Sequence, residues 1–191
     1  MRTTSILLAV LASLASPLAL AQTNVAQGGG VSTTGYSQWP GAPLSSLTDG
    51  MTLPVGTQWD AGTVYWWGEN SDLVNTITIS LLQPSLVSSI SLEADNNDAY
   101  LISYQGLNND WHTLTTIGAG TQWGLDIGSA SFSEIVATAF RINAVAGDGS
   151  YSVAEFKAFG TAAAVPEPES LALMLAGLAL VGASARRRKI K

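Results

Sequence analysis

Alternating hydrophobic and polar residues dominate the middle of the chain. In the segment 76–81, Ile77, Ile79 and Leu81 share one face, while threonine and serine residues occupy the other. Successive side chains of a strand point to opposite faces, so this pattern predicts a strand with one buried face. The same alternation or a high content of strand-forming residues recurs in four further segments, 89–94, 99–105, 140–144 and 153–159.

Clusters of asparagine, aspartate and glycine separate these segments, at residues 95–98, 106–110, 118–120 and 147–149. Such residues favour tight turns because they tolerate unusual backbone angles. Several short strands joined by polar turns predict an all-β fold, an antiparallel β-sandwich. Its inward-facing residues are expected to include Ile90, Leu92, Ala94, Tyr100, Ile102 and Tyr104.

The first residues differ in character from the rest and predict a signal peptide over 1–21. Arg2 supplies a positive start, an apolar stretch follows, and Ala19 and Ala21 form a small-x-small cleavage pattern before Gln22. A retained membrane anchor is the alternative, which Ser16 and Pro17 disfavour by interrupting the stretch. We therefore expect export through the inner membrane, with signal peptidase as a partner.

A second apolar run covers 170–185, and a basic tail follows at 186–191. Sixteen helical residues at about 1.5 Å each would cover roughly 24 Å, which is short of the ~30 Å hydrocarbon core. A short transmembrane helix there would need some snorkelling or bilayer thinning. The arginines would hold this end in the cytoplasm and leave the preceding domain outside.

The C-terminal segment resembles the PEP-CTERM sorting signal. The resemblance is carried by the tripeptide Pro166, Glu167 and Pro168, by the apolar run, and by the basic residues Arg186, Arg187 and Arg188. It implies transient retention at the inner membrane and processing by an exosortase near the tripeptide. It further implies release to the cell surface or to an extracellular, biofilm-type exopolysaccharide matrix.

Between these signals, residues 22–161 form one domain, and 162–191 comprise a linker and the sorting signal. The chain contains no cysteine, which excludes thiol catalysis and thiolate metal sites. From residue 22 to residue 165 there are two basic residues, Arg141 and Lys157, against twelve acidic ones, a formal charge of −10. So negative a surface repels phosphate backbones, and we expect no nucleic-acid partner.

The order of several landmarks resembles the discoidin-type, galactose-binding-like domains, which include coagulation-factor C domains and many carbohydrate-binding modules. These landmarks are 47–50, Trp59, 77–84, 87–92, 140–143 and 151–160. The resemblance implies a jelly-roll β-sandwich and a carbohydrate ligand. It also implies one structural Ca²⁺, held by the carboxylates of Asp49 and Glu155 with Met51 and Thr57 as further ligands. The alternative is a turn aspartate and a solvated strand glutamate.

Candidate ligand-binding residues lie in two segments. Trp66 and Trp67 are neighbours, and in a strand neighbouring side chains face opposite sides, so that one could be buried and the other free to stack on a sugar. Packing against the N-terminal arm is the alternative for each of them. Asn70 follows with an amide. The turn residues Asp95, Asn96, Asn97 and Asp98 could face sugar hydroxyls or a cation, although a purely conformational role in the turn is the simpler reading.

These observations favour a non-catalytic carbohydrate-binding module that acts on exopolysaccharide. A structural or adhesive matrix protein without glycan specificity is the first alternative. A secreted glycan hydrolase that uses two carboxylates is a weaker one. His112 is the only histidine, so neither a zinc site nor a histidine-dependent nucleophile is expected.

Overall fold

The computed structural model describes residues 22–35, 41–68, 72–118, 123–163 and 175–178. One 3₁₀ helix, η1 (Leu44–Thr48), accompanies the strands. The strands are β1 (Thr23–Asn24), β2 (Gly30–Thr34), β3 (Val64–Trp67), β4 (Asp72–Asp95), β5 (Ala99–Gln105), β6 (Trp111–Ile117), β7 (Leu125–Ala146) and β8 (Ser150–Ala162).

Two unusually long strands, β4 and β7, organise the fold. They pair antiparallel along their whole length. The register shifts between two of the pairs, Ser80 with Ala139 and Ser85 with Ala137. Both strands bend at this irregularity and turn back. Consequently the two ends of β4, Asp72 and Asp95, lie at the same end of the molecule. Asp72 pairs with Ala144 in β7. Asp95 is joined by a short turn to β5, and β5 pairs with the same stretch of β7.

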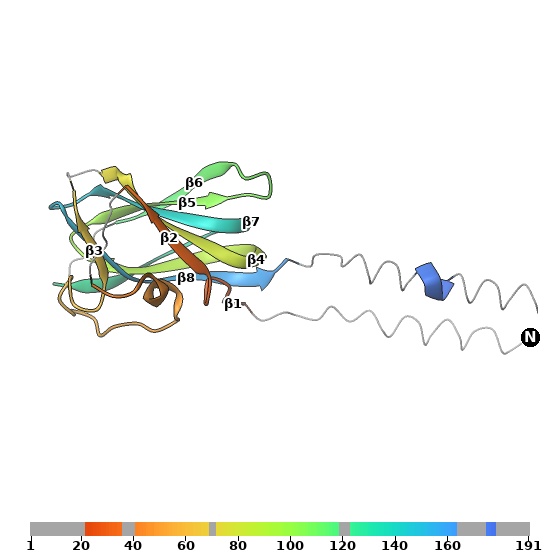
Figure 1. Cartoon of the computed structure of the whole chain (residues 1–191), viewed down its shortest axis with the longest axis horizontal. Coiled ribbons are helices and arrows are strands. Elements are labelled where there is room, and N and C mark those ends of the chain that lie inside the picture. Colours follow the sequence, from red (N-terminus) through yellow and green to blue (C-terminus); the bar gives the residue numbers. More distant parts are fainter. Residues whose placement is uncertain (1–21, 36–40, 69–71, 119–122, 164–174, 179–191) are drawn as a thin grey trace, which may run out of the picture.

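The bend divides the strands into two packed layers (Figure 1). The first layer contains β2, the first half of β4, the second half of β7, β5 and β6. The second contains β1, β3, β8, the second half of β4 and the first half of β7. All of these pairings are antiparallel, which confirms the predicted all-β sandwich.

The hydrophobic core fills the space between the layers. Phe140 from the first layer meets Phe156 from the second, with ring centroids 5.1 Å apart. Both side chains are fully buried, and each such burial contributes about 1.5–3 kcal/mol. The predicted inward faces are confirmed: Ile77, Ile79, Ile90, Leu92, Ala94, Tyr100 and Ile102 are buried, and Leu81 and Tyr104 pack against them.

The predicted strand segments are confirmed, with one difference and several additions. Segments 76–81 and 89–94 are parts of the single strand β4. The strands β1, β2 and β6 and the first half of β7 were not expected. The sequence there gives little signal because residues 128–131 are small, and because β6 exposes several polar side chains. The turns at 95–98, 106–110 and 147–149 are confirmed.

Three connections meet at one end of the sandwich. Asp95 pairs with Leu125, and Ala99 pairs with Ala146. The turn 96–98, the residues just before β7 and the turn 147–149 are therefore neighbours. We call this the loop end. In Figure 1 the far end of β8 and β1 lie at the opposite end of the body.

The predicted signal peptide, 1–21, and the sorting tripeptide, 166–168, lie outside the described residues. Of the predicted apolar helix 170–185, the structure describes 175–178, which are helical. Among the described parts of the chain, no helix is long and apolar enough to cross a membrane.

Candidate functional site

A shallow depression of about 420 Å³ opens at the loop end. Trp59, Asp95, Asn96, Asn97, Trp123, Gly124 and Asp148 line it. These residues come from four separate parts of the sequence, which the antiparallel pairing of β4, β5, β7 and β8 brings together. The depression thus combines indole rings with carboxylate and amide groups.

Hydrogen bonds fix the turns that form the depression. The Asn97 side-chain amide donates to Asp148 Oδ2 at 2.9 Å, and the Ser150 backbone N–H donates to Asp148 Oδ1 at 2.8 Å. The Asn96 N–H donates to the Gly124 carbonyl at 3.2 Å. The three connections are therefore tied to each other, and the polar groups of the depression are held in place.

Two tryptophans supply its apolar surface. The side chain of Trp123 is 72% exposed, which is unusual for so large a ring. Trp59 is held from the other side by an aromatic cluster, with Tyr65 at 5.2 Å and Trp67 at 6.2 Å between ring centroids, both edge-on. A flat, accessible indole next to hydrogen-bonding groups is suited to stack on the apolar face of a sugar ring.

The structure removes Trp66 from the candidate ligand-binding residues. Its side chain is fully buried, and its ring packs 5.5 Å from Tyr151 and 6.3 Å from Tyr100 between centroids. Its neighbour Trp67 points the other way and is 51% exposed, as the alternation of a strand requires. Trp67 lies in the aromatic cluster that holds Trp59. Asn70 lies outside the described residues.

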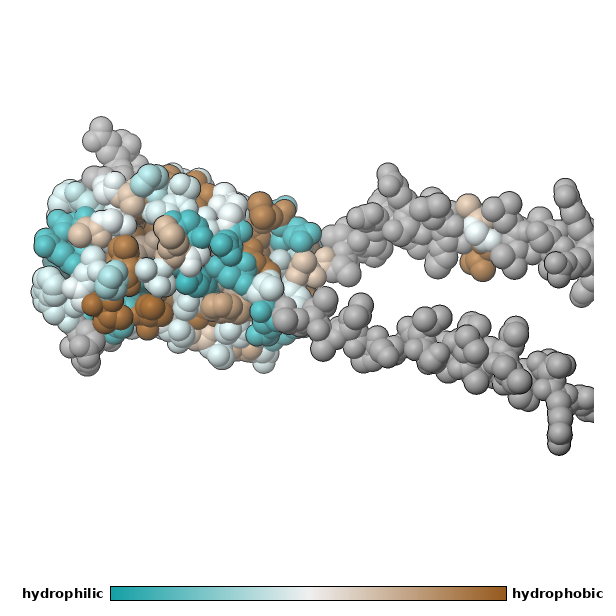
Figure 2. Space-filling model, turned by 90° about the horizontal axis from the view of Figure 1, so that it is seen from below, coloured by the Kyte–Doolittle hydropathy of each residue, from teal (hydrophilic) through white to brown (hydrophobic). Residues whose placement is uncertain are grey.

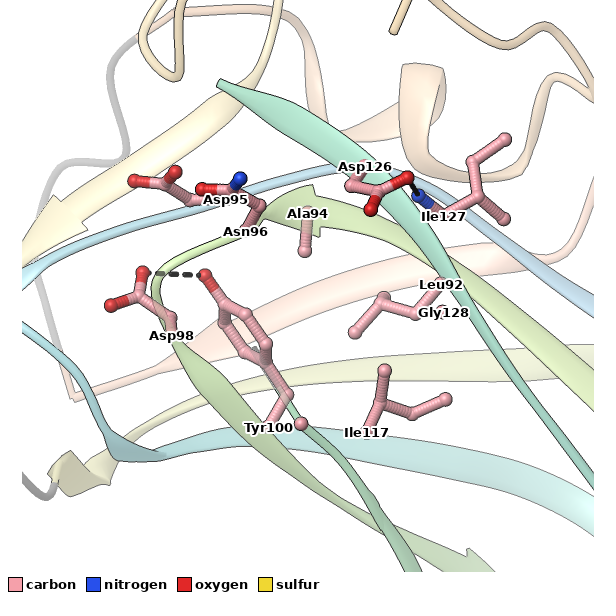
Figure 3. A pocket seen from close by; sticks show the side chains of 11 residues that line it. Leu92, Ala94, Asp95, Asn96, Asp98, Tyr100, Ile117, Asp126, Ile127 and Gly128 are labelled. Atoms are coloured by element: carbon pink, nitrogen blue, oxygen red, sulfur yellow. Dashed lines mark hydrogen bonds between the residues drawn. The ribbon is translucent and has the colours of Figure 1, made fainter. Parts of the chain in front are cut away.

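Beneath the turn 96–98, Asp98 is buried in contact with the core. Figure 3 shows its carboxylate bonded to the Tyr100 hydroxyl, at 3.0 Å. That hydroxyl also lies 2.9 Å from the Ser152 carbonyl and accepts the Ser152 N–H at 3.1 Å. Burial, opposed by the bond to Tyr100, raises the pKa of Asp98 to about 7. A protonated Asp98 can donate to the Tyr100 oxygen while Tyr100 donates to Ser152, so every proton in this chain has an acceptor.

Asp95 reaches the depression directly and shares with Asn96 the wall of a second, smaller cavity of about 80 Å³ above Tyr100. Burial is the main cause that raises the pKa of Asp95 to about 6, and the charge of Asp148 adds to it. Asp95 is therefore largely ionised at neutral pH and available as a hydrogen-bond acceptor. Of the four predicted turn residues, Asp95, Asn96 and Asn97 line the depression, and Asp98 supports them from below.

The structure also brings together the two carboxylates predicted to hold Ca²⁺. The Gly50 N–H donates to Glu155 Oε1 at 3.1 Å, and the Asp49 charge contributes, after burial, to a rise in the pKa of Glu155 to about 7. Glu155 Oε2 is buried without a hydrogen-bond partner. An orphaned carboxylate oxygen beside a second carboxylate is the environment that a hard cation would stabilise, so these residues fit calcium.

The other two predicted ligands are less clearly placed. The Met51 N–H donates to Asp49 Oδ1 at 2.7 Å, which keeps its backbone beside Asp49. The Thr57 hydroxyl donates to the Pro54 carbonyl and the Thr57 carbonyl accepts the Leu125 N–H, so Thr57 is committed to the loop end. Among the described residues, no three Asp, Glu or His side chains converge on one metal position. Backbone oxygens would have to complete the site.

Sequence reasoning did not select Trp59 or Asp148 as site residues, and it left open whether Trp123 lines this end of the sandwich or fills the core. Trp59 and Trp123 stand outside the alternating segments, in stretches rich in glycine. An aromatic residue in a turn-like stretch has no strand to bury it, and that is the signal that could have found both. Asp148 was visible only as part of the turn 147–149, since its partner, Asn97, is 51 residues away.

Residues 164–189 match the family model described as the PEP-CTERM protein-sorting motif. The match covers the predicted tripeptide and the three arginines. It indicates that the protein is exported and that an exosortase processes its C-terminus on the way to the cell surface. A comparison with curated proteins gave no match.

The body of the chain is similar to solved carbohydrate-binding modules. One is the family 32 module of Streptococcus pneumoniae EndoD, at 14% identity and TM-score 0.55, which covers 73% of this chain and 100% of that chain. A second is the family 32 module of C. perfringens NanJ in complex with galactose, at 20% identity and TM-score 0.53, which covers 73% of this chain and 99% of that chain. A third is the lectin domain of lectinolysin complexed with Lewis B antigen, at 14% identity and TM-score 0.55, which covers 75% of this chain and 100% of that chain.

At these identities the likeness establishes the fold. The chain is therefore a discoidin-like β-sandwich with the fold of family 32 carbohydrate-binding modules, and it carries a PEP-CTERM sorting motif at its C-terminus.

Proposed function

We propose that this protein is an exported surface or matrix protein that binds carbohydrate at the loop end without cleaving it. The ligand that best fits its destination is the exopolysaccharide outside the producing cell. The observation that carries the proposal is the depression itself, in which the exposed ring of Trp123 lies beside the acceptors Asp95 and Asp148 and the amides Asn96 and Asn97.

The chemistry of this site matches what a sugar presents. A pyranose ring has an apolar face of C–H groups and a rim of hydroxyls. Trp123 and Trp59 offer flat apolar surfaces for the first, and the carboxylates and amides accept from or donate to the second. The solved modules with galactose and with Lewis B antigen, which share the fold, support a carbohydrate ligand.

Binding is better supported than hydrolysis. A glycosidase needs two carboxyl groups that flank the scissile bond, one as acid and one as base or nucleophile. At the loop end Asp98 is 1% exposed and its carboxyl group is bonded to Tyr100 beneath the turn, so the neighbouring pair Asp95 and Asp98 does not flank a ligand in the depression. The raised pKa of Asp98 has a structural cause in this burial.

We also propose that one Ca²⁺ ion binds at Asp49 and Glu155, with backbone oxygens near Met51. Calcium would neutralise two carboxylates that otherwise repel each other, and it would give Glu155 Oε2 a partner. Since Asp49 follows η1 and Glu155 lies in β8, the ion would tie an N-terminal loop to the last strand.

The test is a binding assay with purified protein and exopolysaccharide from the producing cell, followed by isothermal titration with its oligosaccharides. We expect saturable binding that Trp123→Ala reduces by about tenfold or more, taking as a guide the stacking of a nucleic-acid base on an aromatic ring, which contributes on the order of 1–3 kcal/mol. The control is Leu107→Ala, which changes another exposed apolar residue, in the turn 106–110 at the opposite end of β5.

An unchanged glycan affinity in Trp123→Ala would contradict the loop-end site. Absence of binding to any glycan would favour the alternative of a structural or adhesive matrix protein. Release of shorter sugars from the polysaccharide, abolished by Asp95→Asn, would favour a hydrolase.

A further inference from the structure

Among the residues that the structure describes, one cation lies on the outer face of the first layer. Arg141 lies in β7 next to Ile142, which is fully buried, so the Arg141 side chain projects away from the core. Its guanidinium carbon lies 3.8 Å from the centroid of the Trp111 ring in β6. This stacking holds the cation flat against the sheet.

Among the residues that the structure describes, none accepts a hydrogen bond from this guanidinium. Arginine has five N–H groups in a planar fork. Nε of Arg141 is buried without a hydrogen-bond partner, and among the described residues no carboxylate forms an ion pair with Arg141. The adjacent outward residue, Asn143, is different, because its amide donates to the Asn75 carbonyl at 2.9 Å and to the Thr76 hydroxyl at 2.8 Å. Asn143 thus secures the sheet, whereas Arg141 has unused donors.

The absence of an acidic partner is notable in so acidic a domain. Burial raises the pKa of both Glu93 and Glu155, and the charge of the other basic residue of the body, Lys157, partly opposes that rise. Lys157 therefore balances buried carboxylates. On the first layer, the described acidic residues are at the margins, with Asp110 in the turn before β6 and Asp72 at the start of β4. Arg141 consequently remains the positive centre of this face.

Hydroxyl groups surround this centre in register. Arg141 pairs with Thr78 on one side and with Ser103 on the other. Paired residues of neighbouring strands point to the same face. The pairing continues outward from these two, so that one row crosses five strands: Ser32, Thr78, Arg141, Ser103 and Thr113. At about 4.8 Å between strands, this row is about 19 Å long.

We propose that this face, centred on Arg141 and Trp111, is a second carbohydrate contact that binds a uronic acid residue of an acidic polysaccharide. Because Nε is buried, the terminal Nη1 and Nη2 groups of the guanidinium bind the sugar carboxylate through paired N–H donors, and the hydroxyl row bonds to the sugar hydroxyls. The choice of a sugar as the carrier of the carboxylate rests on the proposed function. The site itself is separate from the loop end and stands on its own contacts.

The test uses a short oligomer of galacturonic acid and, as the matched ligand, the same oligomer with its carboxyl groups methyl-esterified. Binding is followed by NMR shifts of the backbone amides of the purified protein. We expect shifts at residues 78, 103, 113 and 141 with the acid and none there with the ester. Arg141→Gln should lower the affinity for the acid about tenfold or more, because a charge-assisted hydrogen bond contributes about 1.5–3 kcal/mol.

Trp123→Ala serves as the control, because it alters the loop end and leaves Arg141 in place. It should not change the affinity for the acid, and Arg141→Gln should not change binding of neutral glycan at the loop end. The two sites can therefore fail independently. Melting temperatures of both variants show that the fold is retained.

Three results would overturn the proposal: equal shifts with acid and ester, unchanged affinity in Arg141→Gln, or binding of poly-glutamate as tight as that of the uronic acid oligomer. The last would assign the face to an acidic protein segment instead of a sugar.

Discussion

The side-chain amide of Asn97 donates a 2.9 Å hydrogen bond to Oδ2 of Asp148 and so joins two turns that are 51 residues apart in the sequence. One turn connects β4 to β5 and the other connects β7 to β8. Because both residues line the depression, this bond fixes the position of the two turns relative to each other in its wall. Loop-end recognition therefore depends on a contact between two elements that the sandwich brings together.

Asn97→Asp tests this contact. The new carboxylate would face Asp148 at hydrogen-bonding distance, and two like charges would repel each other. We expect loss of glycan affinity with a decrease of about 1 kcal/mol or less in the free energy of unfolding, since the bond is exposed to solvent. Urea unfolding and titration calorimetry measure the two effects. Asn108→Asp, in the exposed turn 106–110, is the control, and an equal effect there would refute the role of Asn97.

The two neighbouring tryptophans of β3 should behave in opposite ways. Trp66→Ala removes a fully buried ring from contact with Tyr100 and Tyr151, so the free energy of unfolding should fall by about 3–5 kcal/mol. Trp67→Ala removes a half-exposed ring and should cost far less, while it loosens the support of Trp59. Denaturant unfolding of both variants checks the difference. Similar losses would mean that the alternation of β3 is wrong.

Buried carboxyl groups give stability a specific pH dependence. Burial raises the pKa of Asp98 and of Glu155 to about 7 in the folded state. Between about pH 4 and pH 7, the folded protein therefore holds protons that the unfolded chain has released. The free energy of unfolding must then fall as the pH rises through this window.

Asp98→Asn provides the measurement of this dependence. The amide cannot ionise, so the variant should show a smaller decrease in the free energy of unfolding between about pH 4 and pH 7. Urea unfolding in the presence of a chelator, with Asp110→Asn as an exposed control, follows the effect. Wild-type stability that increases steadily from pH 4 to pH 7 would contradict the assigned burial of Asp98.

Calcium binding should restore part of the stability that the protein loses as its buried carboxyl groups ionise. A ligand that binds only the folded state stabilises it by about 2.7 kcal/mol at one hundred times its dissociation constant. We expect added Ca²⁺ to raise the melting temperature, and we expect Glu155→Gln to abolish the increase. Glu134→Gln changes an exposed glutamate of β7 and should leave the increase intact. An unchanged melting temperature in wild-type protein, or the same increase in Glu155→Gln, would refute the calcium site.

Local patterns were sufficient for the core but not for the site. Ile77, Ile79, Ile90 and Leu92 could be assigned because strand alternation is a local property, and the structure buries all four. The continuity of β4 through the bend near Ser85 could not be assigned from the sequence, since it depends on pairing with β7.

The depression depends on still longer separations. Asp95 and Asn96 were selected for their turn chemistry, but nothing local indicates that Trp59, Trp123 and Asp148 converge on them. Trp66 and Trp67 show the remaining ambiguity. The alternation predicts that one of them is buried, and only the packing against Tyr100 and Tyr151 decides which.

Mapping of a bound oligosaccharide tests the central claim most directly. In an NMR titration with a neutral oligosaccharide from the producing cell's polysaccharide, we predict that amide shifts cluster at residues 95–97, 123–124 and 148, together with the indole N–H signals of Trp59 and Trp123. These shifts should be saturable and should disappear in Trp123→Ala. Saturable shifts confined to other surfaces, or none with any glycan tested, would contradict carbohydrate recognition at the loop end.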